Sequence, residues 1–313
     1  MISSIEFRAM NTSVMLAAEG EGAIPGMYAA KMFIDDCEQR FSRFLPASEV
    51  TELNRSAGTW LQVSNELMDM LQLSMEYHKS TNGIFDPSIL PDLKQAGYDR
   101  SMDEIRAHGV HNLPEVSNWI SRPSFDEFSL DIENRRVRLP RGLEIDLGGI
   151  AKGWIVEKAA QLLHKYVEAC GVSAGGDILF IGRPRDGMDW DVSLEDPRNP
   201  TELLTQLHIP AGAIATSSIM KRTWSQGEKV RHHLIDPRTG EPAKTDWLSV
   251  TVISRSVIEA DVFAKAILIA GEKDFSGLVK AKELTFIAVD SDGKLSGSAN
   301  YKDYLYEFTS EPI

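Results

Sequence analysis

The chain has 313 residues, of which 42% are hydrophobic and 25% are charged, as in globular proteins with a sizeable core. Its 46 acidic and 33 basic residues give a formal net charge of -13 at pH 7. This charge argues against a nucleic-acid partner, and any anionic ligand must be met by local cations or backbone N–H groups. The only two cysteines, Cys37 and Cys170, exclude a disulfide framework and a thiolate metal site, so we expect two buried free thiols.

The N-terminal segment MISSIEFRAMNTSVMLAAEGEG lacks the basic start and the continuous apolar core of a signal peptide. No apolar run anywhere in the chain reaches the length of about 18 residues that a membrane span needs. The sequence therefore predicts no membrane partner, and a cytoplasmic protein is the simplest expectation.

Apolar spacing and turn residues predict the elements of the first third. Two short strands turn at Met10-Asn11, and two of the following helices have polar N-cap candidates, Ser48 and Ser64. Asn82-Gly83 is typical of a helix C-cap. The predicted elements are strands within 3–17, a Gly-rich turn over 19–26, and helices over 27–44, 48–55 and 64–81.

Two Gly-Gly turns stand out in the middle of the chain. Leu143–Leu147 alternates as a strand and runs through Gly148-Gly149 into a helix over 150–166, with Lys152 in its first turn. Such a turn at a helix N-terminus suits a phosphate, although a tight turn that needs small residues for packing explains it equally well. The second turn, Val172–Asp177, ends at an aspartate that could orient a ligand or merely cap the turn.

The last part of the chain alternates strands with one long apolar helix. Asp261 and Lys265 are four residues apart on that helix and therefore share a face, as a surface pair or as a buried one. We expect a single α+β domain over residues 1–313, in one piece or as two lobes, with mainly antiparallel sheets and a cleft among the Gly-rich turns. The predicted elements are a hairpin over 128–139, strands at 178–181, 190–195, 204–209, 213–217, 248–253, 284–290, 295–298 and 304–309, and helices at 257–270 and 273–281.

The stretch from Ala215 to Gly240 concentrates groups that can do chemistry. Adjacent His232 and His233 on a strand would place one ring on each side of the sheet. The following Asp-Pro-Arg-Thr-Gly is a turn that would hold Asp236 in place. His233 could face a cleft, or it could donate a hydrogen bond to a backbone carbonyl as an ordinary strand histidine.

Five separated segments, in order, resemble the ApbE family of FAD:protein FMN transferases. Their order and their spread over nearly the whole chain make a chance similarity improbable. The segments are Phe41-Ser-Arg-Phe with Ser48-Glu-Val-Thr-Glu-Leu-Asn54; Gly83-Ile-Phe-Asp-Pro87; Ile145-Asp-Leu-Gly-Gly-Ile-Ala-Lys-Gly153; Ala174-Gly-Gly-Asp-Ile178 with Trp190-Asp-Val-Ser-Leu-Glu-Asp-Pro197; and His233-Leu-Ile-Asp-Pro-Arg-Thr-Gly240 with Ser249-Val-Thr-Val and Glu259-Ala-Asp261.

The resemblance implies a mixed α+β fold with a pocket for FAD. It also implies attack by a Thr or Ser hydroxyl of an acceptor flavoprotein on the FMN-side phosphorus of FAD, with Mg²⁺ assistance and release of AMP. The alternatives are an FAD pyrophosphatase that gives free FMN and AMP, and an FAD-binding protein without transferase activity.

Site residues follow from the same resemblance. It makes His233 the candidate base, with Asp236 and Lys265 as further catalytic candidates. Asp261 and the backbone carbonyl of Ala151 would hold the metal. The residues expected around FAD are Gly148, Gly149, Lys152, Asp177, Ala215, Thr216, Ser217, Ser218 and Asp236.

The chain departs from the family pattern at the metal site. Lys265 stands where the family has a threonine, and Thr216-Ser217-Ser218-Ile219 replaces the usual Thr-Ser-Gly-Asp. A charged ammonium has no acceptor, so it cannot coordinate a cation. At an effective dielectric of about 20, a divalent ion roughly 4 Å away would be repelled by on the order of 8 kcal/mol. We therefore hypothesise that Lys265 replaces Mg²⁺ and that this member, which lacks a lipoprotein signal, depends weakly on Mg²⁺ or not at all.

Overall fold

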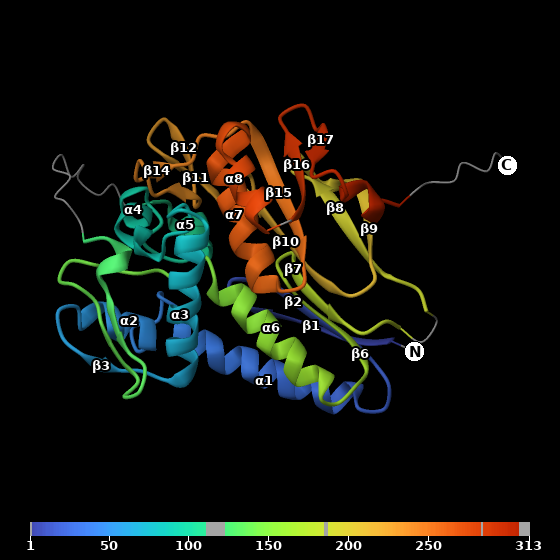
Figure 1. Cartoon of the computed structure of the whole chain (residues 1–313), viewed down its shortest axis with the longest axis horizontal. Helices are drawn as coiled ribbons and strands as arrows, with labels where there is room; N and C mark the ends of the chain where they lie inside the picture. The colour runs from blue at the N-terminus through green and yellow to red at the C-terminus, as the bar shows by residue number, and fades with distance from the viewer. Residues whose placement is uncertain (1, 111–122, 185–186, 283, 307–313) are drawn as a thin grey trace.

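An eight-stranded antiparallel sheet runs through the computed structural model (Figure 1), which describes residues 2–110, 123–184, 187–282 and 284–306. The mixed α+β fold expected from the sequence is thereby confirmed. The strands, in their order across the sheet, are β1 (Ile2–Ala9), β2 (Thr12–Glu19), β6 (Ala169–Ala174), β7 (Asp177–Ile181), β10 (Gly212–Ser218), β15 (Trp247–Ser254), β16 (Thr285–Asp290) and β17 (Leu295–Gly297).

Three long helices cover one face of this sheet, and Figure 1 shows two of them, α6 and α7, in front of the strands. They are α1 (Ala23–Phe41), α6 (Ala151–His164) and α7 (Val257–Asp274). Helix α7 is buried nearly all round up to Gly271 because it lies between the sheet and α6, and this is why that part of its sequence is mostly apolar. Asp261 therefore lies inside the protein, and the surface-pair interpretation of Asp261 and Lys265 is wrong.

The opposite face of the sheet packs against a long hairpin. Strands β8 (Trp190–Asp196) and β9 (Asn199–Ile209) form this hairpin, and its apolar side chains share a cluster with β7, β10 and β16. The Trp190 ring stacks on the Phe180 ring with centroids 4.8 Å apart. The hairpin thus covers part of the face that the helices leave free, while Ile2 and Met15 at the β1–β2 end stay exposed.

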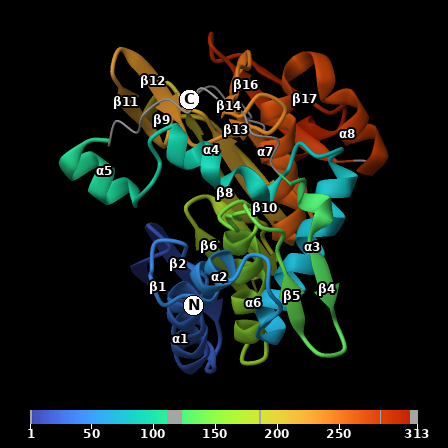
Figure 2. The ribbon, with the colours of Figure 1, turned by 90° about the vertical axis from the view of Figure 1, so that its left-hand side faces the viewer.

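Shorter elements form a second group beside the helical face. Ser48 and Ser64 cap α2 and α3 as expected, each accepting a hydrogen bond from the backbone three residues on. Figure 2 shows the β11–β12 hairpin beside α4. The elements of this group are α2 (Glu49–Arg55), α3 (Asn65–Ser80), α4 (Leu90–Gln95), α5 (Met102–His108), 3₁₀ turns at Pro87–Ile89 and Phe125–Glu127, and strands β3 (Leu61–Gln62), β4 (Ser129–Asp131), β5 (Arg136–Arg138), β11 (Thr223–Gln226), β12 (Lys229–His232), β13 (Ile235–Asp236) and β14 (Glu241–Pro242). Helix α8 (Ser276–Lys282) follows α7, and the 3₁₀ turn Tyr301–Tyr304 packs on β16 and β9.

Several predicted elements are wrong. The Gly-rich turn expected over 19–26 ends at Gly22, because α1 already begins at Ala23. Leu143–Leu147 is not a strand, because the Asn54 side chain, rather than a neighbouring strand, bonds both the N–H and the C=O of Ile145. The segment before Gly175 is not merely a turn, since Ala169–Ala174 forms β6 within the sheet. Of the strand expected over 304–309, Tyr304 ends a 3₁₀ turn and Leu305 makes an isolated bridge with Leu207, while 307–309 lie outside the described residues.

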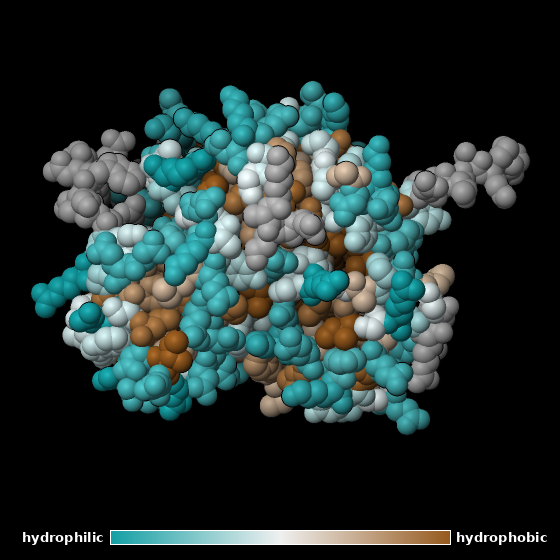
Figure 3. All heavy atoms as spheres, in the orientation of Figure 1, coloured by the Kyte–Doolittle hydropathy of each residue, from teal (hydrophilic) through white to brown (hydrophobic). Residues whose placement is uncertain are grey.

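Both cysteines are buried and unpaired, as expected. Burial raises the pKa of each thiol to about 12, which keeps both protonated at neutral pH. In the part of the chain that the structure describes, no helix is long and apolar enough to cross a bilayer. Figure 3 shows polar side chains over most of one face, with the apolar ones in separate patches.

Candidate functional site

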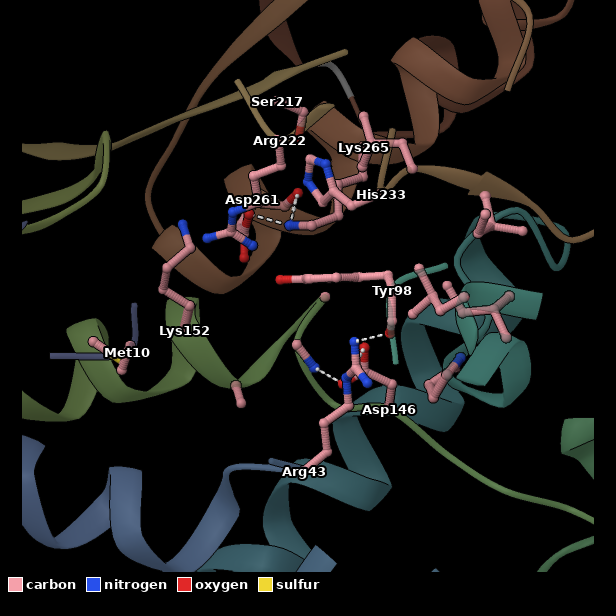
Figure 4. A pocket seen from close by; sticks show the side chains of 18 of the residues that line it. Met10, Arg43, Tyr98, Asp146, Lys152, Ser217, Arg222, His233, Asp261 and Lys265 are labelled. Atoms are coloured by element: carbon pink, nitrogen blue, oxygen red, sulfur yellow. Dashed lines mark hydrogen bonds and ion pairs between the residues drawn. The ribbon is translucent and has the colours of Figure 1, made fainter. Parts of the chain in front are cut away.

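A cavity of about 230 Å³ collects side chains from both groups of elements. The β1–β2 turn reaches it with Met10 and Asn11, which turn the hairpin with positive φ values of 53° and 56°. Figure 4 shows the charged side chains of one wall pointing toward one another. The predicted site residues that line this cavity are Gly148, Gly149, Ala151, Lys152, Thr216, Ser217, Ser218, His233, Asp261 and Lys265.

Ala215, Asp177 and Asp236 were also expected around FAD, and they do not line the cavity. Ala215 packs in the main apolar core. Asp177 is fully buried at the start of β7, where it forms an ion pair with the ammonium group of Lys152. Asp177 therefore lies behind Lys152 as seen from the cavity, and a direct contact of Asp177 with FAD stays a prediction.

Asp236 holds the turn that follows the histidine pair. Its carboxylate accepts hydrogen bonds from the backbone N–H of Arg238 at 2.9 Å and from the Arg238 guanidinium at 2.9 to 3.2 Å. Its backbone carbonyl accepts from Gly240 at 2.8 Å, and Gly240 has a φ of 68°. The predicted turn is confirmed, whereas the catalytic and cofactor roles of Asp236 stay predictions.

The two histidines face different surroundings, although not by strand alternation. Strand β12 ends at His232, and His233 lies in a bend before β13. The His232 ring contacts the Ala243 carbonyl at 3.1 Å, while His233 lines the cavity. The bend therefore separates the two rings, although both bond the backbone, since His233 also has a hydrogen bond with the backbone of Arg222.

The environment of His233 keeps its imidazole neutral. Burial lowers the pKa of His233 well below 6.5, and the charges of Arg222, His232 and Lys265 lower it further. A hydrogen bond with the backbone of Arg222 opposes these effects in part. Its Nδ1 is buried without a hydrogen-bond partner. A neutral imidazole with a free ring nitrogen in a cavity can accept a proton from a substrate.

Asp261 and Lys265 pair within one turn of α7. The Lys265 Nζ donates to the Asp261 carboxylate and, at 3.1 Å, to its backbone carbonyl. The Asp261 side chain is only 2% exposed and that of Lys265 is 15% exposed. Burial lowers the pKa of Lys265, and the charge of Asp261 opposes this shift.

Lys152 brings a second ammonium group to the same wall. It lies in the first turn of α6, donates to the Ala174 carbonyl at 3.4 Å and pairs with Asp177. Burial lowers its pKa to about 7, while Asp261 acts in the opposite direction. Lys152 thus links the two Gly-rich segments that the sequence singled out.

Gly148 and Gly149 lie where the chain passes from the buried segment into α6, and a side chain at either position would fit tightly. A Cβ on Gly148 would lie 3.1 Å from the Asp146 carboxylate, and one on Gly149 would lie 3.1 Å from the Phe85 ring. The Gly148 N–H donates to Asp146 at 2.9 Å. Close packing therefore accounts for these glycines, and both still line the cavity.

The end of β10 carries two hydroxyl groups that form hydrogen bonds with β15. Thr216 bonds Thr251 through their hydroxyls at 2.8 Å, and Ser218 donates to the Leu248 carbonyl at 3.0 Å. Ser217 lies between them and lines the cavity (Figure 4). These bonds fix the strand end against β15.

Sequence reasoning missed several cavity residues. Arg222 follows β10 in a loop and faces Asp261, and the adjacent basic pair Lys221-Arg222 was the signal for it. Tyr98 and Arg43 lie on the opposite wall, where Arg43 pairs with Asp146 at 3.4 Å and donates to the Tyr98 carbonyl at 2.9 Å. No local pattern marks Tyr98, because its position depends on distant segments.

Comparisons with known proteins match nearly the whole chain. A family model described as ApbE family matches residues 10–288. The chain is 25% identical over 278 residues to a Vibrio cholerae protein named FAD:protein FMN transferase, covering 87% of this chain and 82% of that one. A Klebsiella pneumoniae protein of the same name is 28% identical over 250 residues, covering 77% and 75%.

Solved structures show the same fold. The crystal structure of the ApbE protein from Thermotoga maritima matches with a TM-score of 0.88 and 25% identity, covering 98% of this chain and 100% of that one. The flavin transferase ApbE from Vibrio cholerae matches with a TM-score of 0.81 and 21% identity, covering 97% and 99%.

Proposed function

The chain belongs to the ApbE family, and from that premise we propose that it transfers FMN from FAD to a Thr or Ser hydroxyl of an acceptor protein. The names of its relatives support this proposal. In the proposed step, the acceptor oxygen forms a bond to the FMN-side phosphorus. The phosphorus–oxygen bond to AMP breaks, and AMP leaves with the electron pair.

The observation that carries the proposal is the position of His233. Its neutral imidazole lines the same cavity as Lys152, Arg222 and Lys265. The imidazole would accept the acceptor's hydroxyl proton as general base. The cations would stabilise the negative charge that grows on the phosphoryl oxygens and on the leaving AMP.

FAD is the substrate that this wall suits. A diphosphate carries two negative charges, and buried cations aimed into a cavity stabilise such charges strongly. Phe44 and Tyr98 supply aromatic surface on the opposite side of the cavity. These features support a pocket that holds a nucleotide by both its diphosphate and its rings.

Mg²⁺ is implied by the family resemblance, but the residues present do not fit it. Lys265 Nζ already donates to Oδ1 of Asp261, and this ammonium lies where a metal ion bound to that oxygen would lie. Among the residues that the structure describes, no group of three or more His, Cys, Asp or Glu side chains could hold a metal ion. We therefore derive no step through Mg²⁺.

We also propose which partner the chain acts on and that the chain works as a single domain. The acceptor would be a protein that receives FMN as a covalent flavin. The chain would act as one unit, since its main apolar core includes residues from Ala9 to Ala288. A location in the cytoplasm stays a prediction from the sequence.

Incubating the purified chain with FAD, with and without a flavin-free acceptor flavoprotein, tests the proposal. We expect acceptor-bound FMN and AMP in equal amounts, measured by mass spectrometry and chromatography. His233→Ala should lower the transfer rate by about 10²- to 10⁴-fold, while calorimetry still detects FAD binding. Free FMN with AMP would indicate a pyrophosphatase, and intact bound FAD a binding protein.

A further inference from the structure

Three cations converge on the wall that carries Asp261. They come from different elements: Lys152 from α6, Arg222 from the loop after β10, and Lys265 from α7 (Figure 4). Arg222 and Lys265 both act electrostatically on Lys152. Like charges repel one another, so this arrangement is favourable only when anions lie among them.

Each carboxylate of the wall belongs to an ion pair, although Oδ2 of Asp261 has no hydrogen-bond partner. Asp177 pairs with Lys152, and Asp261 pairs with Lys265. Both carboxylates are almost fully buried, with 0% and 2% of the side chain exposed. Each ion pair is therefore neutral overall, and the charge of Arg222 comes in addition to them. This surplus is local, because the chain as a whole has a formal net charge of -13.

The Lys265 ammonium is held from two sides by one residue. It donates to the carboxylate and to the backbone carbonyl of Asp261. A metal ion at the Asp261 carboxylate would have to displace this ammonium or lie beside it. Displacement would leave a buried ammonium without its partner, which is strongly unfavourable.

We propose that Lys152, Arg222 and Lys265 form a metal-independent clamp for the diphosphate of FAD, in which the Lys265 ammonium takes the place that the family resemblance gives to Mg²⁺. The proposal rests on the proposed function for its ligand. Arg222 presents a planar fork of donors that suits two phosphate oxygens at once, whereas the lysines act as compact charges. The clamp would hold FAD before the acceptor arrives.

Calorimetry of FAD binding to the full chain, with EDTA or with millimolar Mg²⁺, tests the clamp. We expect the same affinity in both solutions. Lys265→Met should weaken binding about tenfold or more in both, because it removes one charged donor. Lys265→Thr should weaken binding equally in EDTA and regain affinity with Mg²⁺, since it restores an oxygen ligand beside Asp261.

A metal probe gives a second readout. Mn²⁺, followed by electron paramagnetic resonance, should bind Lys265→Thr in the presence of FAD and should not bind the unmutated chain there. Should Lys265→Met fail to fold with Asp261 unpaired, the double variant Asp261→Asn/Lys265→Met removes both charges. It should also bind FAD more weakly and independently of Mg²⁺.

The clamp is overturned if the unmutated chain loses FAD binding in EDTA and regains it with Mg²⁺, or binds Mn²⁺ in a way that Asp261→Asn abolishes. The proposed function fails separately. A chain that binds FAD without metal and yet flavinylates no acceptor would keep the clamp and refute the transfer.

Discussion

At the scale of the residue, His233 connects electrostatics to the proposed chemistry. Its folded pKa lies well below 6.5 because the ring is buried beside Arg222, His232 and Lys265. The unfolded chain therefore binds more protons than the folded chain between that folded pKa and 6.5. The stability associated with a neutral His233 is present above pH 6.5 and is lost as the pH falls.

Arg222→Gln should move the pH profile of the reaction. The substitution removes a positive charge next to His233, so the pKa of His233 rises toward 6.5. The acidic limb of kcat/KM for transfer, which should lie below pH 6.5 in the unmutated chain, then shifts to higher pH. The measurement is kcat/KM against pH, and the quantity compared is the pH of the acidic limb rather than the maximal activity.

Arg231→Gln is the matched control for Arg222→Gln. Arg231 bonds Gln226 and Glu241 and does not line the cavity. Its charge acts on His232 rather than on His233. If the acidic limb of kcat/KM shifts equally in both variants, the pH profile depends on the overall charge of the protein and not on the pKa of His233.

At the scale of the element, the same Asp-Pro-Arg turn occurs twice in the chain. Asp236-Pro-Arg238 and Asp196-Pro-Arg198 each fold so that the carboxylate accepts from the backbone N–H at 2.9 Å and from the guanidinium Nε at 2.9 and 3.2 Å. Proline presets the backbone, and the arginine closes the ring of bonds. One copy follows His233 and the other joins β8 to β9.

Asp236→Ala and Asp196→Ala separate the structural use of this device from its functional use. Both variants should lower the melting temperature, because each removes the same bonds. Only Asp236→Ala should lower transfer, by on the order of tenfold to a hundredfold, since it lets the His233 bend move. Equal transfer rates in the two variants would mean that the turn after His233 does not position it.

Local patterns predicted the elements whose stability is local. Ser48 and Ser64 cap their helices through bonds to residues three positions away, and these were found from the sequence. Leu143–Leu147 failed because Asn54, 91 residues distant, supplies the bonds that a neighbouring strand would supply. The spacing of apolar residues indicates which side chains are buried, but it does not indicate which groups form hydrogen bonds with the backbone.

The candidate site also combines residues that the sequence predicted with residues that only the structure revealed. The family-like segments led to Lys152, His233, Asp261 and Lys265, which the fold brings to one cavity. Tyr98 is held at this cavity by contacts with distant segments, among them the ring of Trp224 in β11, and no spacing within the sequence encodes those contacts. Site residues outside the matched segments therefore needed the structure.

At the scale of the whole molecule, Trp224 joins two parts of the cavity wall. Its indole N–H donates to the Ala96 carbonyl at 2.7 Å, and its ring stacks on Tyr98 with centroids 5.3 Å apart. The contact spans 128 residues of sequence. It holds the wall that carries Tyr98 against the loop that carries Arg222.

Trp224→Phe should destabilise the fold and weaken FAD binding together. The variant keeps a ring but leaves the Ala96 carbonyl unpaired, at a cost of about 1–3 kcal/mol in the free energy of unfolding. Trp190→Phe is the matched control, because Trp190 donates to the Gly182 carbonyl at 2.9 Å and stacks on Phe180 outside this cavity. Denaturant unfolding and calorimetry should show similar destabilisation in both and weaker FAD binding in Trp224→Phe alone.

The stack of Trp224 on Tyr98 also makes the protein its own optical sensor. Tyr98 points into the cavity, so the indole lies one ring away from whatever enters it. Isoalloxazine absorbs at wavelengths where indole emits, and energy transfer between them should quench the emission of Trp224. Occupancy of the pocket can then be followed in real time without a label, and the decay of that quenching would time the departure of the flavin.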